Sequence, residues 1–267
     1  MGTPKAALEW HGSTLLYRTA AVLSRVVSGP VVVVAAPGQQ LPPLPDGVTV
    51  IEDPVEGLGP MQGIASGLAA VADRAPDAFV CSTDLPFLHP AFVAAVLRLL
   101  CNAREADVAL PVARGFRQPL AAGYRTELFG LIERRVAEGD LRPGMLFEHC
   151  RVEQLSDADL LADPTLARLD PQLESVLNVN EPGDYAISRG RPAPEVVVER
   201  FGALAIGGNR GPRIVRAATL GVAAAKAGLS LDRHVLAALN GDEITRDPEL
   251  PLVVGDTVAF LTADGGG

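Results

Sequence analysis

The first residues with a recognisable chemical pattern are Gly2 and Lys5, which precede a segment expected to be helical. Amide groups at a helix start, together with one lysine ammonium, form a site that suits phosphate groups. The same arrangement is common on protein surfaces, where a lysine at a helix start is simply solvated. Gly2 and Lys5 are therefore candidate phosphate ligands whose role depends on other residues.

Two aspartates follow apolar segments that are typical of buried strands. Asp53 comes near the end of GVTVIEDP, before a glycine-rich helix start, and Asp84 is the first charged residue after the apolar part of FVCSTDLP. Ligands of open parallel sheets bind at the carboxyl ends of strands, so both are site candidates. A carboxylate at Asp84 suits Mg²⁺, which takes one or two carboxylates plus substrate phosphates. The alternative for Asp84 is a helix N-cap, which its position alone does not exclude.

Other polar side chains form weaker patterns. Asn178 and Asn180 alternate in LNVNEPGDY, which places both amides on one face if this segment is a short strand. The Asn180 carbonyl could then complete a metal shell, and an Asx turn before Pro182 is the alternative. In GFRQPLAAGYR, Arg117 and Gln118 could contact an anionic or base-like substrate, although a surface hairpin could carry them as well.

Alternating helices and strands are expected to hold these residues. Helical spacing covers residues 13–27, and a fully apolar β-branched run follows in GPVVVVAAPG. The alternation continues through the strand GVTVIEDP, the helix GPMQGIASGLAAVADRA, the strand DAFVCSTDLP, the helix HPAFVAAVLRLLCNA and the strand ADVALPVA. This order predicts an α/β domain with a parallel sheet that helices cover on both faces.

The amino-acid composition of the chain changes near residue 190, where the proline-rich polar stretch RGRPAPE is typical of a linker. We expect a first domain over residues 1–190, a linker over 191–194 and a second domain over 195–267. The second domain reads as strands over 195–206 and 212–219, a helix over 220–229, a strand with an Asn-Gly turn over 234–244 and a last strand over 256–263. This order predicts a small α+β unit.

Charge and cysteine content exclude several classes of protein. The 267 residues carry a formal net charge of −9, which argues against nucleic acid as a partner. The three cysteines, Cys81, Cys101 and Cys150, form no CxxC pair, so neither a disulfide framework nor a zinc site is indicated. No apolar run approaches the roughly 20 residues of a membrane span, and the N-terminus lacks a signal pattern. The expected location is the cytoplasm, without membrane attachment.

Together, the segments over residues 1–190 resemble the nucleotidyltransferase family that includes molybdenum cofactor guanylyltransferase. In that family a strand leads into a loop reading Leu-Ala-Gly-Gly, a few variable residues, Arg-Met-Gly, two residues and Lys. Met1, Gly2 and Lys5 match the end of this pattern, and RQPLAAGY and NVNEPGDY match two later motifs. The resemblance implies a Rossmann-like parallel or mixed sheet that lacks its first strand here.

The resemblance also implies a reaction: Mg²⁺-dependent transfer of GMP from GTP to the phosphate of the molybdenum-bound pterin, with release of pyrophosphate. GTP and molybdopterin, or the molybdenum cofactor, would be the ligands. It implies catalytic roles for Lys5 and Asp84, nucleotide binding by Gly2, Lys5, Asp53 and Asp84, metal binding by Asp84 and Asn180, and substrate contacts from Arg117 and Gln118.

Residues 195–267 resemble the ubiquitin-like β-grasp sulfur carriers, most closely the small subunit of molybdopterin synthase. There, an apolar run with Gly-Asp-x-Val precedes a tail that ends in Gly-Gly, whose carboxylate is adenylated and converted to a thiocarboxylate. Gly266 and Gly267 take that place. The implied partners are an adenylating activating enzyme and the large subunit of molybdopterin synthase. A plain glycine tail is the alternative.

Three questions remain open at this stage. Cytidylyl transfer to the same pterin is the nearest alternative reaction, and an inactive first domain in a sulfur carrier or scaffold is the alternative of another class. The missing first strand leads us to expect that Met1 is internal and that the natural chain begins roughly 15 to 20 residues upstream. Without that strand, two strands would lack a neighbour and nucleotide binding would be weak.

Overall fold

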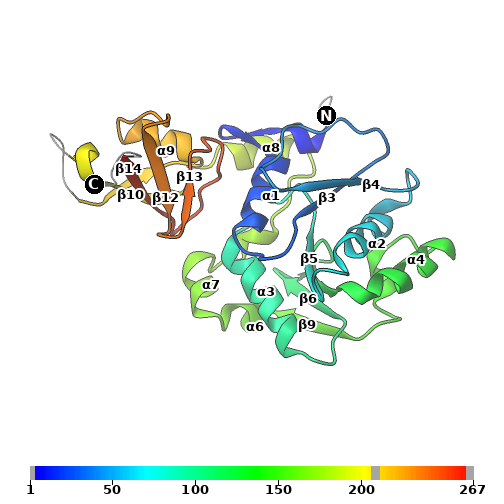
Figure 1. Cartoon of the computed structure of the whole chain (residues 1–267). Helices are drawn as coiled ribbons and strands as arrows, with labels where there is room; N and C mark the ends of the chain where they lie inside the picture. The colour runs from blue at the N-terminus through cyan, green and yellow to red at the C-terminus, as the bar shows by residue number, and fades with distance from the viewer. Residues whose placement is uncertain (1–3, 206–210, 263–267) are drawn as a thin grey trace. The chain divides into compact units, whose positions relative to one another are not determined.

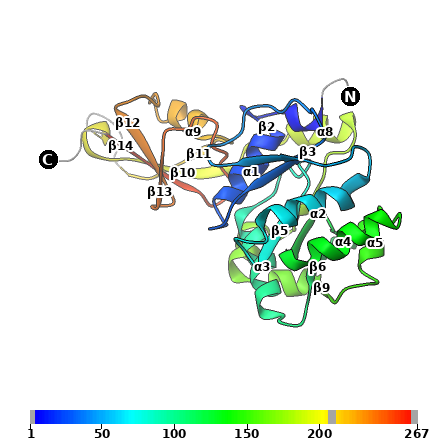
Figure 2. The ribbon, with the colours of Figure 1, turned by 45° about the vertical axis from the view of Figure 1, so that its right-hand side comes forward.

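The chain packs as two units. The structure, a computed structural model, describes residues 4–205 and 211–262, and Figures 1 and 2 show its ribbon from two directions. Within these residues, the larger unit comprises 4–7 and 15–179, and the smaller unit comprises 8–14 and 180–262. Gly2, Gly266 and Gly267 lie outside the described residues. The domain limits expected from the sequence stay a prediction.

Over residues 15–113, the elements of the larger unit follow the predicted order of helices and strands. Short 3-10 helices are η1 (Lys5–Ala7), η2 (Thr126–Leu128) and η3 (Glu174–Val176). The strands are β3 (Val32–Ala35), β4 (Thr49–Glu52), β5 (Asp77–Cys81), β6 (Val108–Ala113), β7 (Phe116–Arg117), β8 (Ala121–Arg125) and β9 (Val152–Ser156). The α-helices are α1 (Leu15–Ser24), α2 (Gly59–Val71), α3 (Pro90–Asn102), α4 (Phe129–Ala137), α5 (Pro143–Leu146), α6 (Asp157–Leu161) and α7 (Pro164–Leu169).

The strands of the larger unit form two separate sheets. Strands β3 and β4 pair in parallel, and a second sheet has the order β5-β8-β6-β7 with β9 parallel to β6. Strand β8 runs antiparallel to both β5 and β6, so of the two forms that the resemblance implies, parallel or mixed, the sheet takes the mixed one. The cause is a two-residue turn at Arg114 and Gly115, both with positive φ, that sends the chain back after β6. The sheet is therefore mixed.

Helices cover both faces of this mixed sheet. Side chains alternate along β6: Ala109 packs with Phe92 of α3 in one hydrophobic cluster, whereas Val108 packs with Met61 of α2 and Ile132 of α4 in another. Figure 1 shows α3 apart from the pair formed by α2 and α4. The predicted coverage of both sheet faces by helices is confirmed for this part of the chain.

Two local predictions near the functional motifs are wrong. Lys5 begins the three-residue helix η1 rather than an α-helix, because β1 (Glu9–Trp10) and β2 (Ser13–Thr14) form a hairpin whose turn, at His11 and Gly12, has positive φ. The segment with Asn178 and Asn180 is irregular rather than a strand. The helix α8 (Pro182–Arg189) follows it, and a reciprocal capping box involving Glu181 starts this helix in place of the expected turn.

The smaller unit contains a five-stranded sheet and a helix. Its elements after α8 are β10 (Glu195–Arg200), η4 (Gly202–Ala205), β11 (Arg213–Arg216), α9 (Leu220–Lys226), β12 (Val235–Leu239), β13 (Glu243–Thr245) and β14 (Thr257–Thr262). The strand order is β11-β10-β14-β12-β13, with β10 parallel to β14 and the other pairs antiparallel. The Asn-Gly turn expected after β12 is confirmed, since Asn240 and Gly241 have positive φ and connect it to β13.

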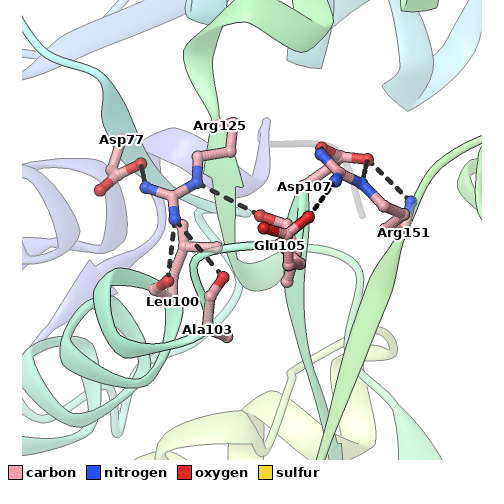
Figure 3. A network of polar contacts seen from close by, with 8 residues as sticks. Asp77, Leu100, Ala103, Glu105, Asp107, Arg125 and Arg151 are labelled. Atoms are coloured by element: carbon pink, nitrogen blue, oxygen red, sulfur yellow. Dashed lines mark hydrogen bonds and ion pairs between the residues drawn. The ribbon is translucent and has the colours of Figure 1, made fainter.

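A half-buried arginine joins three parts of the larger unit (Figure 3). The guanidinium of Arg125 donates to the Asp77 carboxylate at 2.7 Å, to the Ala106 carbonyl at 3.2 Å and to the Leu100 carbonyl at 3.1 Å. These bonds connect β8, the start of β5 and the last turn of α3. Nearby, Arg151 forms a second ion pair on the surface, with the Asp107 carboxylate at 2.7 Å.

We predict that Arg125→Met lowers the free energy of unfolding by about 2 to 4 kcal/mol, because it leaves a largely buried carboxylate and two carbonyls without their donor. Arg151→Met is the matched control and should cost less, since the Arg151 side chain is 61% exposed and the Asp107 carboxylate keeps the hydrogen bond from the Arg151 backbone amide at 2.8 Å. Urea denaturation measures both variants. Equal losses in the two variants would contradict the role given to Arg125.

Candidate functional site

Two of the predicted site residues are in direct contact. The Lys5 ammonium lies 3.2 Å from one carboxylate oxygen of Asp84, across 79 positions of the sequence. Lys5 belongs to η1, and Asp84 stands three residues beyond the end of β5. The Lys5 side chain is 38% exposed and that of Asp84 is 15% exposed. A largely enclosed carboxylate is therefore paired with a cation that solvent can reach.

The loop after β5 is held by several further bonds. The Ser82 hydroxyl donates to the second carboxylate oxygen of Asp84, and the Val179 amide donates to the Asp84 carbonyl at 3.0 Å. The buried Arg18 guanidinium donates to the Pro86 carbonyl at 2.7 Å.

The next helix, α3, is capped by His89, whose ring nitrogen accepts from the Ala91 amide. Asp84 is therefore not the N-cap of α3, and its carboxylate remains a candidate ligand.

Asp53 lies directly after β4, where its amide donates to the Ala35 carbonyl at 2.9 Å. One of its carboxylate oxygens accepts from the Ser66 hydroxyl at 2.7 Å, and the Gln62 amide donates to that hydroxyl at 3.2 Å. Within the described ranges, no hydrogen bond or ion pair joins Asp53 to Asp84. Different hydrogen-bond partners therefore orient the two aspartates.

Ser66 and Gln62 were not among the residues singled out in the sequence, although both orient Asp53. They stand four positions apart on α2, which places them on one face of the helix. That spacing was visible in GPMQGIASGL, but the sequence alone does not show that this face of the helix meets the end of β4.

Arg117 and Gln118 lie in and after β7 of the hairpin. Arg117 is exposed, while the Gln118 backbone amide donates to the Pro111 carbonyl at 2.9 Å and its side-chain amide donates to the Ala113 carbonyl at 3.5 Å. In the part of the chain that the structure describes, neither residue bonds to Asp84. Gln118 therefore supports the hairpin, and the substrate role of both residues stays a prediction.

Asn180 directly follows Val179, whose amide donates to the Asp84 carbonyl at 3.0 Å. Asn180 belongs to the smaller unit, and its metal-binding role stays a prediction. Over residues 4–205 and 211–262, no three His, Cys, Asp or Glu side chains gather into a group that could hold a metal ion. Among the same residues, no helix is both long and apolar enough to cross a bilayer.

Cys81, the last residue of β5, stands three positions before Asp84. Burial raises the pKa of its thiol to about 12 from the usual 9.0, and the negative charge of Asp84 adds to this effect. Because the thiolate is the nucleophilic form, Cys81 is unreactive near neutral pH despite its place beside the site. No nucleophilic role follows from it.

Comparison with known proteins supports the resemblance of the larger unit to nucleotidyltransferases. The model of the MobA-like NTP transferase domain matches residues 1–153. A probable molybdenum cofactor guanylyltransferase from Mycobacterium tuberculosis is 36% identical over 151 residues, which cover 55% of this chain and 73% of that protein. A relative of the same name from Mycobacterium avium is 38% identical over 142 residues, 52% of this chain and 70% of that protein.

A solved structure shows the same fold. The molybdopterin-guanine dinucleotide biosynthesis protein A of Archaeoglobus fulgidus aligns with a TM-score of 0.54 and 21% identity, covering 70% of this chain and 90% of that one. Fold and relatives together define a nucleotidyltransferase. The chain belongs to the MobA-like NTP transferase family.

The raised pKa of Cys81 predicts slow alkylation. At pH 9 the Cys81 thiol of the folded protein should react roughly a thousandfold more slowly than in urea-unfolded protein, and its rate should rise as the pH approaches 12. The exposed Cys101 is the internal control, and peptide mapping by mass spectrometry follows both. Equal rates for Cys81 and Cys101 in the folded protein would refute the burial of this thiol.

Proposed function

We propose that this protein transfers GMP from GTP to the terminal phosphate of a molybdenum-bound pterin and releases pyrophosphate. The observation that carries the proposal is the contact between Lys5 and Asp84, made in a chain whose relatives are named as molybdenum cofactor guanylyltransferases. Those names belong to the relatives and not to this chain. The choice of guanine as the base and of the pterin phosphate as the acceptor is therefore part of the proposal.

The reaction requires positioning and charge neutralisation more than a protein nucleophile. A phosphate oxygen of the pterin attacks the α-phosphorus of GTP, and the bond from that phosphorus to the leaving pyrophosphate breaks. The Lys5 ammonium, which is partly exposed, would bind phosphate oxygens and offset the charge that develops on pyrophosphate. Asp53, oriented by Ser66, would receive hydrogen bonds from the nucleotide.

The donors around Asp84 fit Mg²⁺. A carboxylate with a hydroxyl beside it offers hard oxygen atoms, and the small number of protein ligands suits an ion that keeps several waters and binds substrate phosphates. Asp84 would hold the ion, and Asn180 is a further candidate from its motif alone. When bound, Mg²⁺ supplies charge neutralisation at the phosphate oxygens. Lys5 keeps the Asp84 carboxylate oriented before the substrate arrives.

Substitution of Asp84 tests the proposal. Asp84→Asn should lower GMP transfer by at least about 10²-fold and reduce the response to added Mg²⁺, because the charge that would hold the ion is lost. Asp73→Asn, at an exposed position near the end of α2, is the matched control and should keep full activity. Labelled GTP and CTP, each supplied with Mg²⁺ and the pterin cofactor, measure the transfer.

The nucleotide comparison separates the alternatives. Transfer of CMP instead of GMP would replace the guanylyl proposal with the cytidylyl one. If neither nucleotide is transferred, the larger unit is inactive and the carrier or scaffold function is favoured. Retained transfer in Asp84→Asn would contradict the role of this carboxylate.

We propose further that the smaller unit is a β-grasp sulfur carrier. The first and last strands of its five-stranded sheet, β10 and β14, pair in parallel at the centre, and β14 is the last element of the described residues, an arrangement that supports this proposal. Asp256 of the Gly-Asp-x-Val motif has a structural role, because its buried carboxylate accepts from the Val253 amide at 2.8 Å and from the Asn240 side chain at 2.9 Å.

The carrier proposal predicts a terminal thiocarboxylate. Incubation with an adenylating activating enzyme, ATP and a sulfur donor should replace one oxygen of the terminal carboxylate by sulfur, which intact-mass analysis detects. A variant without Gly266 and Gly267 is the control and should keep its mass. An unchanged mass of the full chain would refute the carrier function while leaving the nucleotidyl transfer proposal intact.

A further inference from the structure

The segment over residues 170–179 packs into the core of the larger unit although it forms neither a strand nor a long helix. The side chains of Leu173, Val176 and Val179 are buried, and the first two belong to the hydrophobic cluster around Phe92 of α3. The backbone turns at Leu173, whose φ of 51° lies in the left-handed region that a leucine rarely adopts. Such a turn persists only where its surroundings hold it.

The carboxylate of Asp170 provides this hold. One of its oxygens accepts from the Glu174 amide at 2.7 Å, and the other accepts from the Ser175 amide at 3.0 Å and from the Ser175 hydroxyl at 2.6 Å. These amides begin η3, so Asp170 caps that helix from four residues before it. Asp170 is buried, and in the described part of the chain no ion pair includes it. Hydrogen bonds alone therefore compensate its charge.

The Ser175 hydroxyl carries this connection to the end of the loop that follows β5. A hydroxyl has one hydrogen, so its donation to Asp170 leaves its lone pairs free to accept. It accepts from the His89 amide at 3.1 Å, and this bond is buried. His89 is the residue that caps α3. Asp170, Ser175 and His89 thus form one buried hydrogen-bonded series.

The same segment holds the beginning of that loop. The Val179 amide, three residues beyond the end of η3, donates to the Asp84 carbonyl at 3.0 Å. Asp84 and His89 are the first and last residues of the loop over 84–89, and both bond to the segment that Asp170 shapes. The backbone of Asp84 therefore depends on Asp170, although no hydrogen bond joins their side chains within the described ranges.

We propose that Asp170 is a positioning residue for Asp84. Its buried carboxylate shapes the segment over 173–179, and this segment holds both ends of the loop that begins with the candidate metal ligand. The inference rests on the function proposed above, in which the Asp84 carboxylate binds Mg²⁺. Asp170 acts on that ion only indirectly, because it limits the orientations that Asp84 takes before the ion arrives.

Asp170→Asn tests the proposal. All three groups around Asp170 donate to it, so an amide in its place turns its own donor toward at least one of them. The Mg²⁺ concentration for half-maximal GMP transfer should rise about tenfold, because a loosely held carboxylate binds the ion less well. The rate at saturating Mg²⁺ should fall less than threefold, since Lys5 and Asp84 are both present. Transfer from labelled GTP to the pterin cofactor, measured over a Mg²⁺ titration, gives both quantities.

Asp163→Asn is the matched control. The Asp163 carboxylate caps α7 in a similar way, because it accepts from the Thr165 amide at 2.7 Å and from the Leu166 amide at 2.8 Å. The control should lose stability, which urea denaturation measures, but its Mg²⁺ midpoint should equal that of the wild type. A rise of the midpoint by the same factor in both variants would reduce the effect to a general loss of stability and overturn the proposal.

Hydrogen exchange gives a readout that does not need nucleotidyl transfer. On the full chain, the amides of His89 and Val179 should exchange at least tenfold faster in Asp170→Asn than in the wild type, and at an unchanged rate in Asp163→Asn. Ser175→Ala is the second variant if Asp170→Asn does not fold, because it removes only the hydroxyl between Asp170 and His89. It should raise the Mg²⁺ midpoint about threefold and speed the exchange of the His89 amide.

Two further outcomes separate this proposal from the proposed function. Faster exchange with an unchanged Mg²⁺ midpoint would limit Asp170 to a structural role and overturn the proposal. If the wild-type chain transfers no nucleotide, the proposed function fails, and binding of Mn²⁺ alone, followed by the relaxation of water protons, replaces the transfer assay. Weaker Mn²⁺ binding in Asp170→Asn than in the wild type would support the positioning role. Equal binding, or none in either protein, would overturn it.

Discussion

A strand inside a protein needs hydrogen-bond partners along both edges, and β5 has a strand on one edge only among the described residues. Strand β8 pairs with it along five positions, and the bond from Arg125 to Asp77 fixes its first residue. Asp84 stands three residues beyond its last. The position of the candidate site therefore depends on how firmly β5 is held, and β8 with Arg125 supplies that support.

The candidate site combines one cation and two separately supported carboxylates. Asp84 is bound by Lys5 and Ser82, whereas Asp53 is bound by Ser66. This separation matters chemically, because the ammonium offsets the charge of one carboxylate and leaves the other dependent on hydrogen bonds alone. A ligand that brings phosphates would compete with Asp84 for Lys5. A ligand that brings a cation would compete with Lys5 for Asp84. A nucleotide with its metal ion does both, which makes the pair well matched to such a substrate.

Sequence reasoning succeeded where structure is set by local pattern. The β-branched run gave β3, the helical spacing gave α1, α2 and α3, and Asn240 with Gly241 gave a hairpin turn. The resemblance of the larger unit to nucleotidyltransferases is confirmed by the family match. Sequence reasoning failed where strands or side chains that lie far apart in the sequence pair with one another. A short apolar segment does not reveal its direction, so β8 could not be recognised as the central antiparallel strand, and the contact between Ser66 and Asp53 required the fold itself.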